Sequence, residues 1–301
     1  MTISTLTILR WGFWIGLAGV NVALVCAGWS RVDPESINDT RVESRSITTT
    51  EGRRIALEIL RPTDHGTAPR AALMVVHGGS WRGGSVGVGH LGSRATIARL
   101  AQAGIVIVAV DYTLARPGAP SWPQALHDLR AVMRWLRREA SSLEIDPQRI
   151  GVLGFSSGGQ LASLLGTLPD ETDADGVSSK PRVVIDFYGP TDLAQLESQR
   201  HLAHDPIAIY LDSNPREAAS PLDHVSPDDP PFLILHGTAD RWTPIEQSRR
   251  FAARLESQGV PVQLIEVEGA RHGFEASVEF PRSIDLFPGI LAFLNSVWNP
   301  Q

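Results

Sequence analysis

Length, composition and charge place this chain among ordinary globular proteins. It has 301 residues, 43% of them hydrophobic and 20% charged, which allows a sizeable core and excludes a disordered or collagen-like chain. The formal net charge of −6 argues against nucleic acid as a partner. The single cysteine, Cys26, excludes an intramolecular disulfide and a cysteine-based zinc site. None of these quantities determines the oligomeric state.

The N-terminal stretch from Trp11 to Gly28 is almost wholly apolar. It is long enough to span a bilayer as a helix, and cleavage of a signal peptide after Ala27 is the competing interpretation. We therefore predict that residues 1–29 are a signal peptide or a membrane anchor, the anchor using residues 11–28; a buried core helix is the third alternative. Either of the first two places the rest of the chain outside the cytoplasm, as an exported (periplasmic or secreted) or membrane-anchored protein.

The remaining chain divides into a polar linker, residues 30–45, and one catalytic domain, residues 46–301. In that domain short apolar runs alternate with helical patterns. The predicted strands are 55–60, 72–76, 105–110, 150–153, 183–187, 232–235 and 262–267. The predicted helices are 93–103, 122–140, the segment after Ser156, 244–257 and 286–298. This alternation predicts a doubly wound, mostly parallel α/β sheet with helices on both faces. The irregular, Pro-rich stretch 192–230 is the predicted cap segment.

Residues 149–159, R-I-G-V-L-G-F-S-S-G-G, predict a strand, a sharp turn and a helix, with Ser156 at the apex. We expect Gly154 and Gly158 to be required because a side chain at either position would collide with the neighbouring strand or helix. The turn would lift the Ser156 hydroxyl clear of the sheet at a helix N-terminus, where negative charge is favoured. The alternative is a Gly-rich loop that binds phosphate or only turns the chain.

Four polar motifs follow predicted strands, whose carboxyl ends form the site in such sheets. They are H-G-G-S-W at 77–81, S-S at 156–157, H-G-T-A-D at 236–240 and R-H-G-F at 271–274. A serine hydroxyl becomes a strong nucleophile when a histidine accepts its proton and a carboxylate orients that histidine. The backbone N–H groups of Gly78, Gly79 and Ser157 would then stabilise the oxyanion of the tetrahedral intermediate.

With V-A-V-D-Y at 108–112, these motifs resemble the α/β-hydrolase esterases over roughly residues 50–298. The nearest subgroup contains hormone-sensitive-lipase-like carboxylesterases and bacterial acetyl-xylan or feruloyl esterases. The resemblance implies the α/β-hydrolase fold, with Ser156 as nucleophile, Asp240 as acid and His272 as base. It implies a serine esterase without cofactor or metal, which cleaves small-molecule or carbohydrate esters of small or medium acyl groups through an acyl-enzyme.

Two departures from the family pattern concern the surroundings of the site. Ser80 stands where many relatives have a third glycine, which leaves the shape of the oxyanion loop open. Thr113 follows Asp111 and Tyr112 where an arginine is common, a change that affects packing beside the site rather than catalysis.

Several assignments have alternatives. Asp240 could instead cap its own loop, with Glu266 or Glu268 as the acid, and His272 could be a surface histidine. His77 and His236 are expected to be buried and hydrogen-bonded rather than catalytic.

Trp81 either lines the substrate pocket or packs beneath it, and the arginines of helix 122–140 are expected to form its solvated face. For function, the alternatives are an amide hydrolase of the peptidase or arylformamidase type and a binding protein that has lost its chemistry.

Overall fold

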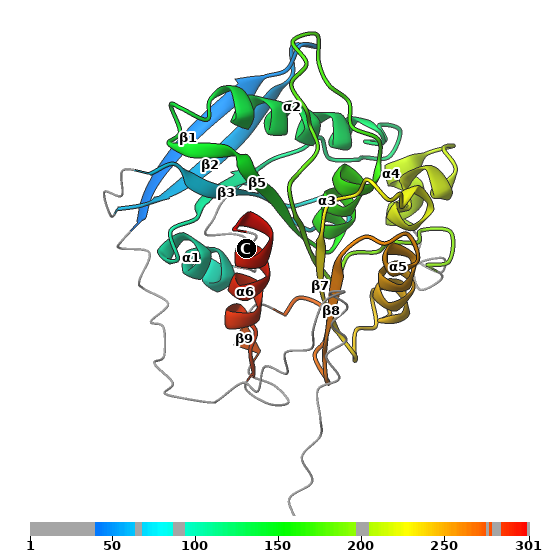
Figure 1. The fold of residues 1–301 in the computed structure, drawn as a ribbon. Helices are drawn as coiled ribbons and strands as arrows, with labels where there is room; N and C mark the ends of the chain where they lie inside the picture. Colours follow the sequence, from blue (N-terminus) through cyan, green and yellow to red (C-terminus); the bar gives the residue numbers. More distant parts are fainter. Residues whose placement is uncertain are drawn as a thin grey trace, which may run out of the picture.

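The computed structural model describes residues 40–63, 68–86, 94–196, 205–274, 277–278 and 284–299. Strands and helices alternate along most of this chain (Figure 1). The strands are β1 Thr40–Thr48, β2 Arg54–Pro62, β3 Arg70–Val76, β4 Val106–Val110, β5 Ile145–Phe155, β6 Val184–Phe187, β7 Phe232–Gly237, β8 Val262–Val267, β9 Ser277–Val278 and β10 Ile284–Asp285. The helices are α1 Arg94–Gln102, α2 Gln124–Arg138, α3 Ser157–Thr167, α4 Pro206–Leu211, α5 Glu246–Ser257 and α6 Phe287–Trp298, with short 3-10 turns η3 Arg216–Ala219 and η4 Pro221–His224.

One eight-stranded sheet forms the centre of the domain, in the order β1-β2-β4-β3-β5-β6-β7-β8. The strand β2 runs antiparallel to both β1 and β4, and from β4 to β8 the neighbouring strands are parallel. This arrangement confirms the predicted doubly wound, mostly parallel sheet. It also brings the carboxyl ends of β5, β6, β7 and β8 to one edge, where residues distant in sequence meet.

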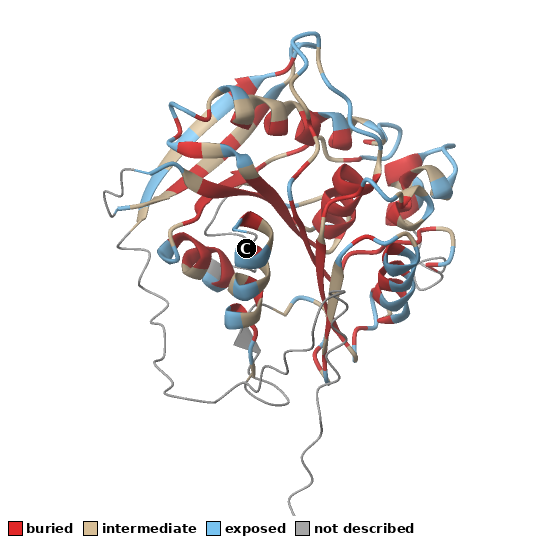
Figure 2. Cartoon of the chain, in the orientation of Figure 1, coloured by how far each residue is buried: buried red, intermediate tan, exposed pale blue. Residues whose placement is uncertain are grey.

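Two hydrophobic cores, one on each face, hold the sheet between its helices. Along β3, Ala72, Met74 and Val76 point into the core beneath α2, α3 and α5, and the alternating residues 71, 73 and 75 point into the core beneath α1 and α6. The central strands are accordingly buried along most of their length, and α3 is buried throughout, whereas α2, α5 and α6 are buried mainly on one side (Figure 2). A fully buried Leu or Val contributes roughly 1.5–3 kcal/mol, so strands covered on both faces are apolar throughout.

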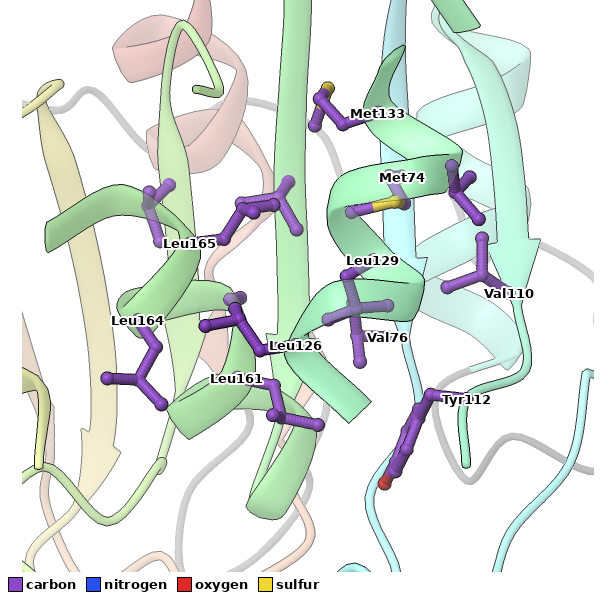
Figure 3. Packing of buried hydrophobic residues seen from close by; sticks show 14 of the residues in the cluster. Met74, Val76, Val110, Tyr112, Leu126, Leu129, Met133, Leu161, Leu164 and Leu165 are labelled. Atoms are coloured by element: carbon purple, nitrogen blue, oxygen red, sulfur yellow. The ribbon is translucent and has the colours of Figure 1, made fainter. Parts of the chain in front are cut away.

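The core beneath α2 and α3 lies directly behind the site. Leu126, Leu129 and Met133 of α2 pack with Met74, Val76 and Val110 of the strands, as Figure 3 shows. Leu161, Leu164 and Leu165 anchor α3 in the same cluster. The helix that follows Ser156 is thus anchored in this core by leucines of its middle turns.

The predicted linker over residues 30–45 is wrong for residues 40–45. They belong to β1, which pairs with β2 from Thr40 opposite Pro62 to Thr48 opposite Arg54. The sequence looks like a linker because β1 is an edge strand, and exposed edge strands carry polar and charged side chains that discourage pairing with other chains.

Residues 1–39 lie outside the described part of the chain, and with them the predicted signal peptide or membrane anchor. Among the residues that the structure describes, none of the helices has the length and apolarity needed to cross a membrane.

The arginines of α2 do not form the expected solvated face throughout. Arg130 is buried, donates to the carbonyl oxygen of Pro169 at 3.1 Å and pairs with Glu171. Arg137 donates to the carbonyl oxygen of Ser178 at 2.9 Å. The long apolar stems of arginine allow the charged heads to reach over the helix and fasten the loop of residues 169–180.

Candidate active site

The nucleophile turn has the strained geometry that the sequence predicts. Ser156 lies between β5 and α3 with φ 55° and ψ −121°, and its N–H donates to the carbonyl oxygen of Phe187 at 2.9 Å. A Cβ at Gly154 would lie 2.1 Å from the carbonyl oxygen of Gly158, and one at Gly158 would lie 2.3 Å from that of Val76. Both flanking glycines are therefore required by close backbone contacts with the helix and with β3.

Three predicted site residues form one hydrogen-bonded chain. His272 Nε2 lies 2.9 Å from Ser156 Oγ, and His272 Nδ1 lies 2.6 Å from Asp240 Oδ2. With Nδ1 protonated toward the carboxylate, Nε2 is left as the acceptor of the serine proton. The side chains come from the ends of β5 and β7 and from the loop after β8, as the sheet order requires.

Asp240 also caps its own loop, so two alternatives of the sequence analysis hold at once. Its Oδ1 accepts from the N–H groups of Trp242 at 2.8 Å and Thr243 at 2.9 Å. Glu266, the alternative acid, instead binds Arg249 with distances of 2.8 and 2.7 Å. Oδ1 of Asp240 thus holds the loop, and Oδ2 binds His272.

His236 is the neighbour of Asp240 that the sequence analysis did not connect to the site. Its Nδ1 accepts from Ser248 Oγ at 2.6 Å, and its Nε2–H donates to the carbonyl oxygen of Thr243 at 2.7 Å. The same Nε2 lies 3.3 Å from Asp240 Oδ2. The prediction of a buried, hydrogen-bonded His236 is confirmed, and the four-residue spacing in H-G-T-A-D is the signal that could have linked it to Asp240.

The ionisation of Asp240 follows from these donors. Burial by itself would raise the pKa of the carboxyl, but hydrogen bonds from His236 and His272, with the charge of His272 and the Thr243 N–H, hold the pKa well below its usual range. Asp240 is therefore a carboxylate at neutral pH, available to stabilise a positively charged His272.

The loop from His77 to Trp81 lies against the serine turn. A Cβ at Gly78 would lie 2.9 Å from the carbonyl oxygen of Phe155 and 3.2 Å from Ser156 Cβ. The Tyr112 hydroxyl donates to the carbonyl oxygen of His77 at 3.1 Å, and the two rings stack at 4.4 Å. The predicted oxyanion donors of Gly78, Gly79 and Ser157 are thus brought together around Ser156.

His77 is buried and hydrogen-bonded, as predicted. Burial lowers its pKa, so the ring is neutral, and Nδ1–H donates to the carbonyl oxygen of Gly78 at 2.8 Å. The loop continues with Ser80 and Trp81, both in the left-handed region at φ 53° and 59°. Ser80 therefore adopts a conformation that glycine takes more readily, which fits the glycine that the family resemblance leads us to expect at this position.

A cavity of about 450 Å³ opens above Ser156, within the range of small-molecule sites. It is lined by His77, Gly78, Gly79, Ser80, Trp81, Gly84, Ser85, Phe155, Ser156, Ser157, Tyr188, Pro190, Leu196, Trp242, Thr243, His272 and Gly273. Pro190 precedes the predicted cap segment of residues 192–230, and Leu196 lies within it. Trp242, by contrast with the buried lining residues, is 59% exposed.

Trp81 fulfils both of its predicted alternatives. It lines the cavity but is only 2% exposed, and its indole N–H donates to Gln160 Oε1 at 2.9 Å. Its ring stacks on Tyr210 of α4 at 4.7 Å. Trp81 thus joins the loop of residues 77–81 to α3 and to the segment of residues 205–230.

The site joins a serine, a histidine and an aspartate by hydrogen bonds at the carboxyl ends of parallel strands, and the serine lies in a strand–turn–helix. This combination defines the class of α/β hydrolases. The model of the family described as BD-FAE matches residues 57–255, two thirds of the chain. The chain belongs to this family of α/β-hydrolase esterases. The match contains Ser156 and Asp240 and ends before His272.

Similar proteins carry esterase names. Esterase LipC of Mycobacterium tuberculosis is 29% identical, over 80% of this chain and 62% of its own. Ethyl acetate hydrolase of Pseudomonas putida is 30% identical, over 80% of this chain and 76% of its own. The chain spans only 54–62% of the lengths of three Mycobacterium tuberculosis relatives.

Among solved structures, esterase 2 of Thermogutta terrifontis with bound butyrate is 27% identical, over 89% of this chain and 98% of its own, with a TM-score of 0.66. The form phosphorylated by paraoxon is 27% identical, over 90% of this chain and 100% of its own, with a TM-score of 0.64.

Proposed function

We propose that this protein hydrolyses carboxylic esters of small or medium acyl groups through an acyl-enzyme. The observation that carries the proposal is the chain of hydrogen bonds from Ser156 through His272 to Asp240, at 2.9 and 2.6 Å. The esterase names of its relatives support the same reaction.

In the first half-reaction, Ser156 Oγ bonds to the ester carbonyl carbon while its proton passes to His272 Nε2. The carbonyl oxygen becomes an oxyanion that the N–H groups of Gly78, Gly79 and Ser157 stabilise, and Asp240 stabilises the histidine cation. When the C–O bond breaks, His272 returns the proton to the leaving alcohol. Water then attacks the acyl-enzyme with His272 as base, which releases the acid and restores the Ser156 hydroxyl.

The substrate proposal rests on the cavity and on the relatives. Ethyl acetate hydrolase is named for a two-carbon acyl group, and esterase 2 of Thermogutta terrifontis binds butyrate. The exposed indole of Trp242, two residues from Asp240, offers a flat apolar face at the rim, with the hydroxyl-bearing Ser80 and Ser85 also lining the cavity. A small alcohol or a sugar ring is the alcohol part that such a rim suits.

A p-nitrophenyl ester series from acetate to decanoate tests the proposal on the full chain. We expect turnover that is highest for acetate or butyrate, and its loss in Ser156→Ala. Ser142→Ala, which changes an exposed serine that does not line the cavity, serves as the matched control and should keep Ser156-dependent turnover. Undiminished turnover in folded Ser156→Ala would refute the mechanism, and cleavage of p-nitroanilides but not esters would favour the amide hydrolase.

For location, we propose that residues 1–29 direct the catalytic domain out of the cytoplasm. The support is the apolar run from Trp11 to Gly28. Fractionation of cells that express the full chain should recover activity in the exported or membrane fraction. Replacing Gly16 and Leu17 by arginine should retain it in the cytoplasm, and unchanged fractionation would contradict the proposal.

A further inference from the structure

The segment from Asp186 to Gly189, at the end of β6, contacts both ends of the Ser156–His272 hydrogen bond. The carbonyl oxygen of Phe187 accepts from the Ser156 N–H at 2.9 Å. The ring of Tyr188 meets the His272 ring edge-on, with centroids 4.7 Å apart and planes at 60°. One short segment therefore touches the nucleophile through its backbone and the histidine through a side chain.

Tyr188 adopts a backbone conformation that an aromatic residue rarely takes. Its φ of 46° lies in the left-handed region, where a bulky side chain is strained unless its surroundings hold it. Its N–H donates to the carbonyl oxygen of Leu235 at 2.9 Å, and its ring packs at 5.1 Å from that of Phe274. This conformation directs the ring toward His272 and the cavity that both residues line.

Asp186 is the residue that closes the turn around Tyr188. Its Oδ1 accepts from the Gly189 N–H at 2.9 Å, and its Oδ2 lies 3.4 Å from Ser163 Oγ of α3. The side chain is fully buried. Burial raises the pKa of this carboxyl to about 6, although the electrostatic influence of the nearby His236 ring and these two donors oppose the rise.

Two glycines leave just enough space for this carboxyl group. A Cβ at Gly159 would lie 2.2 Å from Asp186 Oδ1, and one at Gly189 would lie 2.5 Å from it. Gly159 lies three residues after Ser156, in the first turn of α3. The carboxyl group of Asp186 therefore lies between this turn and the loop that carries Tyr188. A buried carboxyl group is costly unless donors satisfy it, and the Gly189 N–H and the Ser163 hydroxyl are the donors that hold Asp186 here.

We propose that Asp186 and Tyr188 are positioning residues that hold His272 within hydrogen-bond reach of Ser156. The bond from Gly189 to Asp186 fixes the turn, the turn fixes the Tyr188 ring, and the ring supports the edge of the imidazole. The inference rests on the proposed esterase function, because it assigns how the groups of that same reaction are kept aligned.

The test compares paired variants in the full chain with p-nitrophenyl acetate. Asp186→Ala removes the acceptor of the turn, and Asp186→Asn retains one. Tyr188→Ala removes the ring, and Tyr188→Phe retains it. We expect both alanine variants to lower kcat ten- to a hundred-fold with KM within about three-fold, because misalignment of about 1 Å acts on the transition state. Asn and Phe should rescue most of the loss.

Active-site titration separates positioning from loss of fold. The burst of p-nitrophenol counts competent sites when deacylation is the slower step. Because His272 acts in both half-reactions, a positioning defect slows both, so the burst keeps its amplitude while its rate falls. Asp212→Ala is the matched control, since Asp212 has a left-handed φ of 53° but is exposed and does not line the cavity. It should change neither quantity.

Three results would overturn the proposal: a reduced burst amplitude with an unchanged rate per site, equal losses in the conservative and alanine variants, or unchanged kcat in all four. Should Asp186→Ala not fold, the Tyr188 pair alone decides. If the unmodified protein shows no Ser156-dependent turnover of any ester, the proposed function itself fails. That result is distinguishable because it appears before any Asp186 or Tyr188 variant is measured.

Discussion

Asp186 and Asp240 are both buried and lie near the carboxyl ends of adjacent parallel strands, yet their surroundings give them opposite properties. Asp240 receives N–H bonds from Trp242 and Thr243 on one oxygen and meets His272 and His236 on the other. Asp186 receives the Gly189 N–H and the more distant Ser163 hydroxyl. The chemical group and its burial are shared, and the donors differ.

The difference shows that the donors, rather than burial alone, decide how the pKa values of these two carboxyl groups differ. Burial raises the pKa of Asp186 to about 6, and the hydrogen bonds from His236 and His272 outweigh burial at Asp240 and hold its pKa well below the usual range. Asp240 thus stays ionised over a wide pH range and can stabilise a histidine cation, whereas Asp186 accepts the hydrogen bond that holds a turn.

The largest expected effect comes from neutralising Asp240. The matched change at Asp186 should have a much smaller effect. Asp240→Asn should lower kcat/KM about 10⁴-fold, since an amide neither fixes the productive tautomer of His272 nor stabilises its cation. Asp186→Asn, the matched variant on the neighbouring strand, should lose no more than about ten-fold. Steady-state kinetics with p-nitrophenyl acetate measures both, and losses of equal size would remove the distinction between the two residues.

The pH dependence of stability should reveal the raised pKa of Asp186. The folded state holds this proton up to about pH 6 and the unfolded state releases it near pH 4, so the contribution of Asp186 to stability falls as pH rises between these values. The Asn variant cannot titrate at this position, so it should not lose this contribution as the pH rises. Its free energy of unfolding, relative to that of the unmodified protein, should therefore increase by up to about 3 kcal/mol between pH 4 and pH 7.

Urea unfolding of both proteins at several pH values measures this gap. A constant gap would mean that Asp186 titrates in its ordinary range. Asp240 should give the opposite sign: its folded-state pKa is depressed, so its contribution is present above about pH 4 and is lost as pH falls further.

His236 tests whether the donors at Asp240 matter for catalysis. His236→Phe keeps an aromatic ring but removes the Nε2–H group, whose nitrogen lies 3.3 Å from Asp240 Oδ2. We expect kcat/KM to fall about ten-fold, the effect of losing one hydrogen bond to a charged group. His236→Gln, which carries a donor, should recover part of the loss. Equal activity of the Phe variant and the unmodified protein would show that His272 and the loop N–H groups suffice.

The smallest effect should come from Ser163, the weaker donor at Asp186. Ser163→Ala removes a hydroxyl that lies 3.4 Å from Oδ2, so it should cost less than about 1 kcal/mol at pH 7, where the carboxylate is charged. At pH 4, where the folded-state carboxyl is protonated, the cost should approach zero. Chemical denaturation at the two pH values measures it, and a cost independent of pH would contradict the role of Ser163 as a donor to the charged form.

Much of the fold was predictable because local patterns report burial and turns. Continuous apolar runs such as 105–110 indicated strands covered on both faces, and the confirmed sheet has such a strand at β4. The polar strand β1 was missed because an edge strand has little apolar signal. Its identity depends on the partner β2, which lies across a turn and supplies the hydrogen bonds.

The sequence by itself determined the strand–turn–helix at Ser156 and the order of the polar motifs, since glycine spacing and chain order are local properties. Only the tertiary structure decided that Tyr188 meets His272 and that Asp186 lies against Ser163 of α3. These contacts join strand ends and loops that are brought together by the sheet order, and periodicity within one strand carries no information about the side chains at the end of the next.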